Sequence, residues 1–238
     1  MLRQARFEAT TLLRNGEQLL VSLVLPVGAL VALALTRSPS LGVGRRIDLA
    51  VPGVLALCVV SAAFASQAIA TGFDRRASVL RLLGTTTLGR GGLLGAKVVA
   101  TLVVEIVQWL VVGAVGLALG WQPAVAGLGY AALFLLLGTW AFVALALLLA
   151  GTVRAEGVLA VANLVWVLLL VVGGVVVPRV ELPAAAANVV GLLPSAALGD
   201  GLRAALTGGA FSAVPLLVLV VWGVVATALA ARTFRWSD

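Results

Sequence analysis

The chain has 238 residues, of which 62% are hydrophobic and 11% are charged, and its mean hydropathy of +1.18 excludes an ordinary soluble domain and indicates an integral membrane protein. Its formal charge of +7 comes from Arg and Lys beside the apolar runs, without the interleaved aromatic residues typical of nucleic-acid binding, so we expect no nucleic-acid partner. A single cysteine, Cys58, and the absence of histidine leave almost no ligands for a zinc, haem or iron–sulfur site and allow no intrachain disulfide.

The first segment, residues 1–18, predicts an amphipathic helix that lies flat on the cytoplasmic face of the membrane. It mixes leucines and a phenylalanine with arginines and glutamates at short intervals. A cleavable signal peptide is the competing interpretation. Glu8 and Glu17 argue against it, because the leading region of a signal peptide is short and basic.

Six apolar runs are long enough to cross a hydrocarbon core of about 30 Å, which takes roughly 20 helical residues. We place the spans at residues 19–35, 50–71, 93–119, 124–152, 157–177 and 213–231. An even number of spans puts both termini on one side of the membrane, and most Arg and Lys fall on that side, together with the loop 73–97. The positive-inside bias therefore predicts that this loop and both termini are cytoplasmic.

The loop after the second span begins with a short amphipathic helix, which we place at residues 73–83. Its apolar residues recur at helical spacing, and arginines lie beside them. Such a helix has two interpretations: it lies in the headgroup layer and binds anionic lipid, or it docks on a partner protein. The apolar residues are Phe73, Ala77, Leu80 and Leu83, and the arginines are Arg75, Arg76 and Arg81.

The segment before the last span, residues 178–209, is neither a clean span nor a solvated loop. Its apolar pieces are too short to cross a membrane, and Pro183 and Pro194 separate them. We therefore expect one or two short re-entrant or interfacial helices in this segment.

One carboxyl lies inside a predicted span. Ionised Glu105 near the middle of a helix would cost about 2.5–3.5 kcal/mol, so we expect it to be protonated, partnered or in contact with water. Thr101 and Gln108 share its helical stripe, which places all three against other protein. Gln67 and Asn163 are further polar residues within spans. These residues either form interhelical hydrogen bonds or line a substrate pathway, and no nucleophile–base or carboxylate pair indicates catalysis.

Two stretches of the chain together resemble the membrane subunit of type-2 ATP-binding-cassette (ABC) exporters. In residues 51–97 the family pattern is met by Pro52-Gly53, by the charged turn Phe73-Asp-Arg-Arg76 and by Thr87-Leu-x-Arg90. In residues 173–209 it is met by Gly173-Gly174 ahead of Pro178, by Leu182-Pro183, by Leu193-Pro194, by Gly201-Leu-Arg203 and by Gly208-Gly209. Three positions depart from the pattern: Asp74 replaces the usual Glu, Thr86 the expected Pro and Leu193 the frequent Asn.

The resemblance implies a single all-α membrane domain over residues 1–238, with six spans, an N-terminal interfacial helix, a cytoplasmic coupling helix and re-entrant helices before the last span. In this family the coupling helix docks on a separate ATPase subunit, and the turn 152–156 matches a second, smaller contact. The residues that would make these contacts are Phe73, Asp74, Arg75, Arg76, Leu80, Arg81, Leu83, Arg154 and Glu156.

The chain lacks the Gly-rich phosphate loop that ends in Gly-Lys-Ser/Thr, because its only lysine, Lys97, stands in Gly-Ala-Lys-Val. ATP and Mg²⁺ are therefore expected on a separate ATPase subunit, present in two copies, and this chain is expected to bind no cofactor or metal. We expect the permease to pair with a second copy or a sister permease, surrounded by the lipids of a bacterial inner (plasma) membrane.

The resemblance implies a transport subunit, not an enzyme, that exports a hydrophobic or amphipathic compound such as a drug, a lipid or a glycolipid. A haem-exporter-like permease of cytochrome maturation is the alternative within the family. A membrane-embedded enzyme that acts on lipid headgroups would need a polar cluster at the membrane face, where the loops offer only Asp74 and Glu156. A secondary transporter would need several ionisable residues at mid-membrane, and Glu105 alone is weak support for that function.

Overall fold

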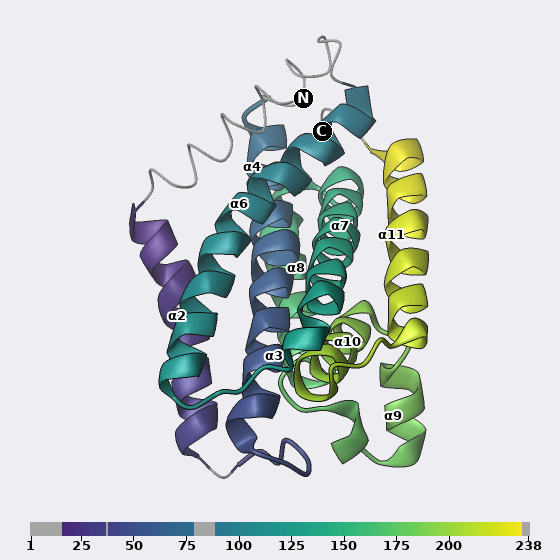
Figure 1. The fold of residues 1–238 in the computed structure, drawn as a ribbon. Coiled ribbons are helices and arrows are strands. Elements are labelled where there is room, and N and C mark those ends of the chain that lie inside the picture. Colours follow the sequence, from purple (N-terminus) through teal and green to yellow (C-terminus); the bar gives the residue numbers. More distant parts are fainter. Residues whose placement is uncertain (1–15, 37, 79–88, 235–238) are drawn as a thin grey trace.

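The computed structural model describes residues 16–36, 38–78 and 89–234, and every regular element in this part of the chain is helical (Figure 1). The long helices run side by side, and two short ones gather at one end of the bundle. The elements are α2 (Gly16–Leu35), α3 (Arg46–Val59), the π-helix η1 (Val60–Ser66), α4 (Gln67–Arg76), α6 (Gly89–Ala118), the 3₁₀ turn η2 (Val125–Gly127), α7 (Leu128–Thr152), α8 (Ala155–Val171), the 3₁₀ turn η3 (Arg179–Glu181), α9 (Ala184–Val190), α10 (Pro194–Gly208) and α11 (Ala213–Thr233).

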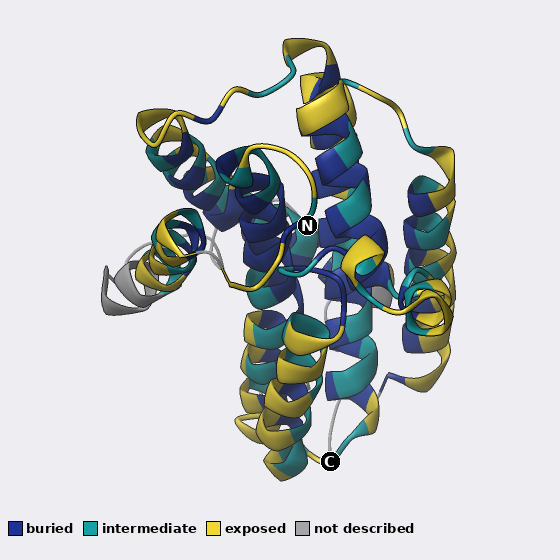
Figure 2. Cartoon of the chain, turned by 90° about the horizontal axis from the view of Figure 1, so that it is seen from below, coloured by how far each residue is buried: buried dark blue, intermediate teal, exposed yellow. Residues whose placement is uncertain are grey.

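The core of the bundle forms around α3 and α7. Helix α7 packs against α4, α6, α10 and α11, while α3 packs against α2, α6 and α10. Every residue of α3 from Ala50 to Val59 is buried, and buried residues fill the interior in Figure 2. Large apolar side chains also lie on the outer surface, with Leu110 69% and Leu217 63% exposed. An outward apolar surface of this extent is typical of helices that face lipid.

Four helical segments are long and apolar enough to cross a membrane: Arg46–Arg76, Gly91–Ala118, Val125–Thr152 and Ala213–Thr233. They coincide with four of the six predicted spans. Two further predicted spans correspond to shorter apolar helices, Ser22–Leu35 within α2 and Ala155–Val171. Counted as one broken span, α9 and α10 would add a fifth crossing by length and composition. The count of six spans therefore stays a prediction.

The predicted end of the fifth span, at residue 177, is wrong. Helix α8 ends at Val171, and residues 172–177 are irregular. The reason lies in two glycines: Gly174 adopts a positive φ of +72°, and at Gly173 a Cβ would lie 2.2 Å from the Leu169 carbonyl oxygen. Only glycine tolerates this backbone without strain, so the helix stops there.

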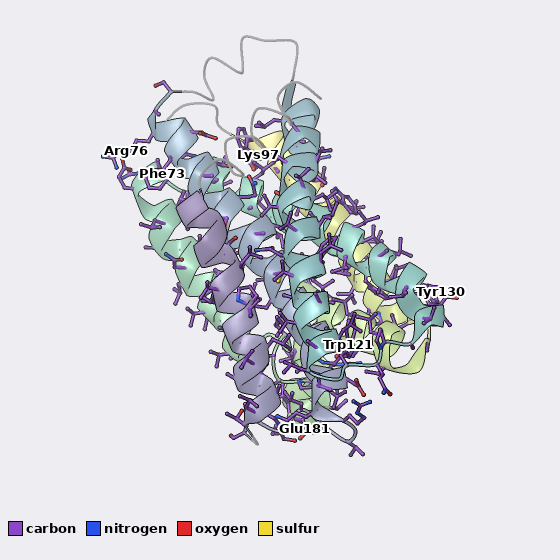
Figure 3. All side chains as sticks on the ribbon, turned by 60° about the vertical axis from the view of Figure 1, so that its left-hand side comes forward. Phe73, Arg76, Lys97, Trp121, Tyr130 and Glu181 are labelled. Carbon is purple, nitrogen blue, oxygen red and sulfur yellow. The ribbon has the colours of Figure 1, made fainter. Side chains whose placement is uncertain are left out.

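The segment before the last span forms two short helices, as its prolines predict. Helices α9 and α10 meet at an angle of 97°. Pro194 occupies the first turn of α10, where its missing N–H removes no helical hydrogen bond. Both helices lie at the end of the bundle that also carries Trp121, which we call the Trp121 end (Figures 1 and 3).

The helix predicted at residues 73–83 does not begin at Phe73. Helix α4 continues to Arg76, and the chain then turns at Ser78, which has a φ of 59°. Phe73 and Arg76 therefore belong to the last turn of a span, at the opposite end of the bundle, which we call the Arg76 end (Figure 3). Leu80, Arg81 and Leu83 lie outside the described residues, as does most of the predicted interfacial helix 1–18.

Candidate functional site

A cavity of about 420 Å³ lies between α2, η1, α4, α6 and α8. Leu25, Pro26, Val104 and three alanines supply its apolar wall. Its polar lining consists of Ser22, Ser61, Ser66, Gln67, Thr101, Gln108, Asn163 and Trp166. The structure thus brings four of the five predicted polar span residues to one cavity, and only Glu105 lies elsewhere.

The π-helix shapes one wall of this cavity. In a π-helix the backbone N–H of one residue bonds to the carbonyl five residues earlier, which widens the turn, so side chains five apart lie on the same side of the helix. Ser61 and Ser66 have this spacing, and both reach the cavity. Trp166 of α8 donates a hydrogen bond from Nε1 to Ser61 Oγ over 3.0 Å, which holds α8 against this wall.

Hydrogen bonds from two glutamine side chains connect the helices around the cavity. Gln67 donates from Nε2 to Thr101 Oγ1 over 2.9 Å, which links α4 to α6. Gln108 donates from Nε2 to the Ser22 carbonyl over 3.0 Å, which links α6 to α2. Its buried Oε1 atom has no hydrogen-bond partner among the described residues. One acceptor at the cavity is therefore unsatisfied.

Glu105 is fully buried and lies away from the cavity, between α6 and α7. It contacts the Thr139 hydroxyl, which also donates to the Leu135 carbonyl over 2.9 Å. A hydroxyl has a single hydrogen, so both contacts are satisfied at once only when the Glu105 carboxyl is protonated and donates to Thr139 Oγ1. This geometry fits an interhelical hydrogen bond.

Lys97 connects the cavity to the Arg76 end. Its ammonium lies 3.6 Å from Asp74 Oδ2 and 3.5 Å from Gln67 Oε1, and only 2% of the residue is exposed. Both partners of Lys97, the Asp74 carboxylate and the Gln67 amide, belong to α4. Lys97 therefore holds α6 to both ends of α4, through a charged pair at the last turn and a hydrogen bond at the first residue.

A shallow hollow of about 80 Å³ opens at the Arg76 end between α4 and α8. Phe73, Arg76 and Glu156 line it, together with Ile69, Ala155, Val158 and Leu159. Phe73 is 56% exposed. Arg154, just before α8, is also exposed. Residues from the two predicted ATPase-contact segments, 73–83 and 152–156, thus meet around one hollow.

Arg75 does not belong to this exposed surface. It is 4% exposed, and its guanidinium donates to the carbonyls of Ala150 and Val153 at the end of α7. These carbonyls have no partner within their own helix, since the helix ends there. The side chain therefore caps a neighbouring helix, and the contact of Arg75 with an ATPase stays a prediction. Asp74 is also only partly exposed, and its carboxylate pairs with Lys97.

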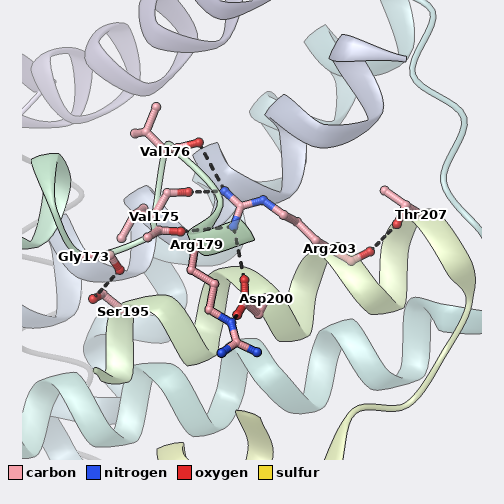
Figure 4. A network of polar contacts seen from close by, with 9 residues as sticks. Gly173, Val175, Val176, Arg179, Ser195, Asp200, Arg203 and Thr207 are labelled. Carbon is pink, nitrogen blue, oxygen red and sulfur yellow. Dashed lines mark hydrogen bonds and ion pairs between the residues drawn. The ribbon is translucent and has the colours of Figure 1, made fainter. Parts of the chain in front are cut away.

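The Trp121 end is closed by a network centred on Arg203 (Figure 4). Arg203 is 7% exposed and donates to the carbonyls of Gly174, Val175 and Val176. Its Nη1 lies 3.8 Å from Asp200 Oδ1, and Asp200 also pairs with Arg179. Ser195 donates to the Gly173 carbonyl over 2.8 Å.

The same network explains why the chain has glycine after Pro52. A Cβ on Gly53 would lie 2.9 Å from the Val175 carbonyl oxygen and 3.1 Å from Arg203 Nη2. Any larger residue would push apart α3, the 172–177 segment and α10. The two stretches that carry the family pattern, far apart in sequence, therefore meet at one point in the structure.

Several residues of these sites were not predicted from the sequence. Ser22 and Trp166 of the cavity, Thr139 beside Glu105 and the contacts of Lys97 depend on how the helices pack. The available signal for Thr139 was its position as a polar residue in the middle of the apolar run of α7. Within the described part of the chain no group of three His, Cys, Asp or Glu side chains could hold a metal ion.

Comparison with known protein families places most of the chain in a family of membrane proteins. The model of the family described as ABC-2 type transporter matches residues 4–207, which is most of the chain and includes the cavity, the hollow at the Arg76 end and Arg203. No curated protein matches the chain.

Proposed function

Because the chain belongs to the ABC-2 type transporter family, as a membrane permease subunit, we propose that it forms the substrate pathway of an ATP-driven exporter and is driven by separate ATPase subunits that dock at the Arg76 end. The observation that carries this proposal is the hollow at that end. An exposed aromatic side chain, Phe73, lines it together with a cation, Arg76, and an anion, Glu156. An apolar anchor with charges at its rim is the usual composition of a docking surface.

The contacts behind the hollow would transmit movement into the bundle. A force on Phe73 acts on the last turn of α4, which Lys97 and Asp74 connect to α6 and which Arg75 connects to the end of α7. These connections are polar and at least partly buried, so α4 would move together with its neighbours. Closure of the ATPase subunits would in this way alter the helices around the 420 Å³ cavity.

A second permease subunit would complete the pathway. The outward face of α8 carries large apolar side chains, with Leu164 60% and Leu168 53% exposed. We propose that two copies, or this chain and a sister permease, meet in the membrane with two ATPase subunits beneath them. The transported compound would be hydrophobic or amphipathic, in keeping with the cavity's mostly apolar wall.

The docking proposal is tested by co-purification of the permease with its partner ATPase. Phe73→Ala should lower the amount of bound ATPase by about fivefold or more, as truncation of a central anchor does. Phe211→Ala is the matched control, because Phe211 is similarly exposed (48%) but belongs to the loop before α11 at the Trp121 end. It should leave ATPase binding unchanged.

Two further variants separate docking from simple membrane contact. Arg76→Ala should reduce binding less than Phe73→Ala, and its effect should shrink at high salt, because rim charges are screened. A Leu80→Ala/Leu83→Ala double variant extends the test to the predicted helix beyond α4. Full ATPase binding by both Phe73→Ala and the double variant would rule out docking at this surface.

A further inference from the structure

We propose that the 420 Å³ cavity is a ligand-binding site for an uncharged molecule that carries hydroxyl or amide groups on an apolar body. This inference deepens the proposed transport function and rests on it for its physiological meaning. Pockets that bind drug-sized molecules have volumes on the order of 300–1,000 Å³ and are mostly apolar with a few convergent polar groups. The cavity between α2, η1, α4, α6 and α8 meets both conditions.

Its lining carries no formal charge among the described residues. The polar members are hydroxyls, amides and one indole. The charged groups of the surrounding helices are turned to other partners: Lys97 is paired with Asp74 and contacts Gln67, and Glu105 contacts Thr139 on α7. An ionic headgroup would lose its water without gaining a counter-charge, which is strongly unfavourable in an apolar environment.

The available hydrogen-bonding groups specify what an uncharged ligand would offer. Gln108 Oε1 is buried without a partner among the described residues, and it accepts a hydrogen bond. Ser61 Oγ already accepts from Trp166 Nε1, so its hydroxyl hydrogen is oriented away from that ring and can be donated. A hydroxyl group satisfies both roles, and an amide satisfies them with its N–H and its carbonyl.

The route into the cavity explains the apolar body. Leu25 of α2 is 49% exposed, and Asn163 of α8 and Ser66 of η1 are exposed as well, so the cavity opens between α2 and α8. The neighbouring outer surfaces of α2 and α8 are apolar, with Val24 58% and Leu164 60% exposed. A molecule that arrives along these surfaces would need an apolar portion to partition there.

The test uses the full-length chain in phosphatidylcholine nanodiscs, without an ATPase. Three photoreactive probes share one decyl chain with a diazirine and differ only in the headgroup: neutral glucosyl, anionic phosphate or cationic trimethylammonium. After irradiation, the labelled peptides are identified by mass spectrometry. The glucosyl probe should label peptides of α2, η1 and α6, and unlabelled decyl glucoside should compete with it to saturation. The two charged probes should label these peptides at least about tenfold less, as expected for a headgroup left without a counter-charge.

Two variants locate the site, each by a different mechanism. Gln108→Leu removes the free acceptor and should weaken saturable labelling by about threefold to tenfold, which corresponds to one hydrogen bond. Ala65→Leu fills the cavity from η1 and should weaken it at least as much while leaving Gln108 in place. Gln122→Leu is the control, since Gln122 is exposed in the loop after α6 and does not line the cavity.

The possible results fall into distinct groups. Equal or stronger labelling by a charged probe would overturn the inference. Labelling that does not saturate and that neither cavity variant changes would also overturn it, because it would show only a lipid-filled groove. Loss of the glucosyl signal with Phe73-dependent ATPase binding intact would refute the ligand site and leave the transport proposal standing. Saturable labelling, together with ATPase binding that Phe73→Ala does not change, would support the ligand site and count against docking at Phe73.

Discussion

The ammonium of Lys97 lies 3.6 Å from the carboxylate of Asp74, and this pair fastens the start of α6 to the last turn of α4. The two side chains are unequally exposed, 3% for Lys97 and 38% for Asp74. The pair therefore connects a buried cation to an anion at the Arg76 end of the bundle. A contact of this kind bears on both stability and coupling, and the two effects are separable.

Removal of the Asp74 charge should destabilise the bundle. In Asp74→Asn the buried Lys97 ammonium loses its counter-charge, which is expected to cost about 1–3 kcal/mol. The double variant Asp74→Asn/Lys97→Met removes the buried charge as well and should recover part of that loss. Thermal unfolding in detergent measures both. Glu156→Gln, at an exposed acid of the same end, is the control and should have little effect.

Glu105→Gln should preserve both stability and transport. The amide reproduces the protonated carboxyl, because its N–H donates to Thr139 Oγ1 while the Thr139 hydroxyl continues to donate to Leu135. Thr139→Val should instead lower stability by about 1–3 kcal/mol, since it leaves the carboxyl without this partner. Transport in proteoliposomes and the yield of assembled protein are measured together. Reduced transport by Glu105→Gln at normal yield would assign Glu105 to the pathway.

Arg203→Lys keeps the positive charge but should still lower the stability of the protein. The planar guanidinium reaches three successive carbonyls of the 174–176 segment, and a lysine ammonium cannot reproduce that fork. We expect a loss of about 1–3 kcal/mol for buried carbonyls left without donors. Arg179→Lys provides the comparison, because Arg179 is half-exposed and pairs with the same Asp200. Similar melting temperatures for the two variants would contradict the special role of Arg203.

Topology reporters should separate the two ends of the bundle. The structure places the loop at Gly42 beside Glu181, at the same end as α10. Fusions at Gly42 and Gly201 should therefore report the external side, and fusions after Gly84 and Asp238 should report the cytoplasm, as the distribution of Arg and Lys predicts. A cytoplasmic signal at Gly201 would refute the six-span arrangement.

The sequence predicted what depends on local pattern. Hydrophobic length located the four full spans, prolines located the break between α9 and α10, and helical spacing placed Thr101 and Gln108 on one buried stripe. It predicted the end of α8 wrongly, and it did not indicate that Arg75 is buried. Arg75 looked like a surface charge because its partners are backbone carbonyls about seventy-five residues later, which no sequence pattern reveals. The cavity combines four separate stretches of chain, so its lining could be named only in part.

The π-helix η1 fixes the rotational phase between the two halves of one span, α3 and α4. A π-helix holds one more residue than the α-helix that turns through the same angle, so loss of a residue from 60–66 would let this stretch wind as an α-helix and leave the phase of α4 nearly unchanged. Gain of a residue has no such outlet and would rotate α4 by about 100° against α3. Gln67 would then turn away from Thr101, and Arg75 would leave the carbonyls of Ala150 and Val153. Composition and hydropathy would hardly change. In this stretch the number of residues therefore matters as much as their identity, and single-residue insertions should be tolerated far less than apolar substitutions.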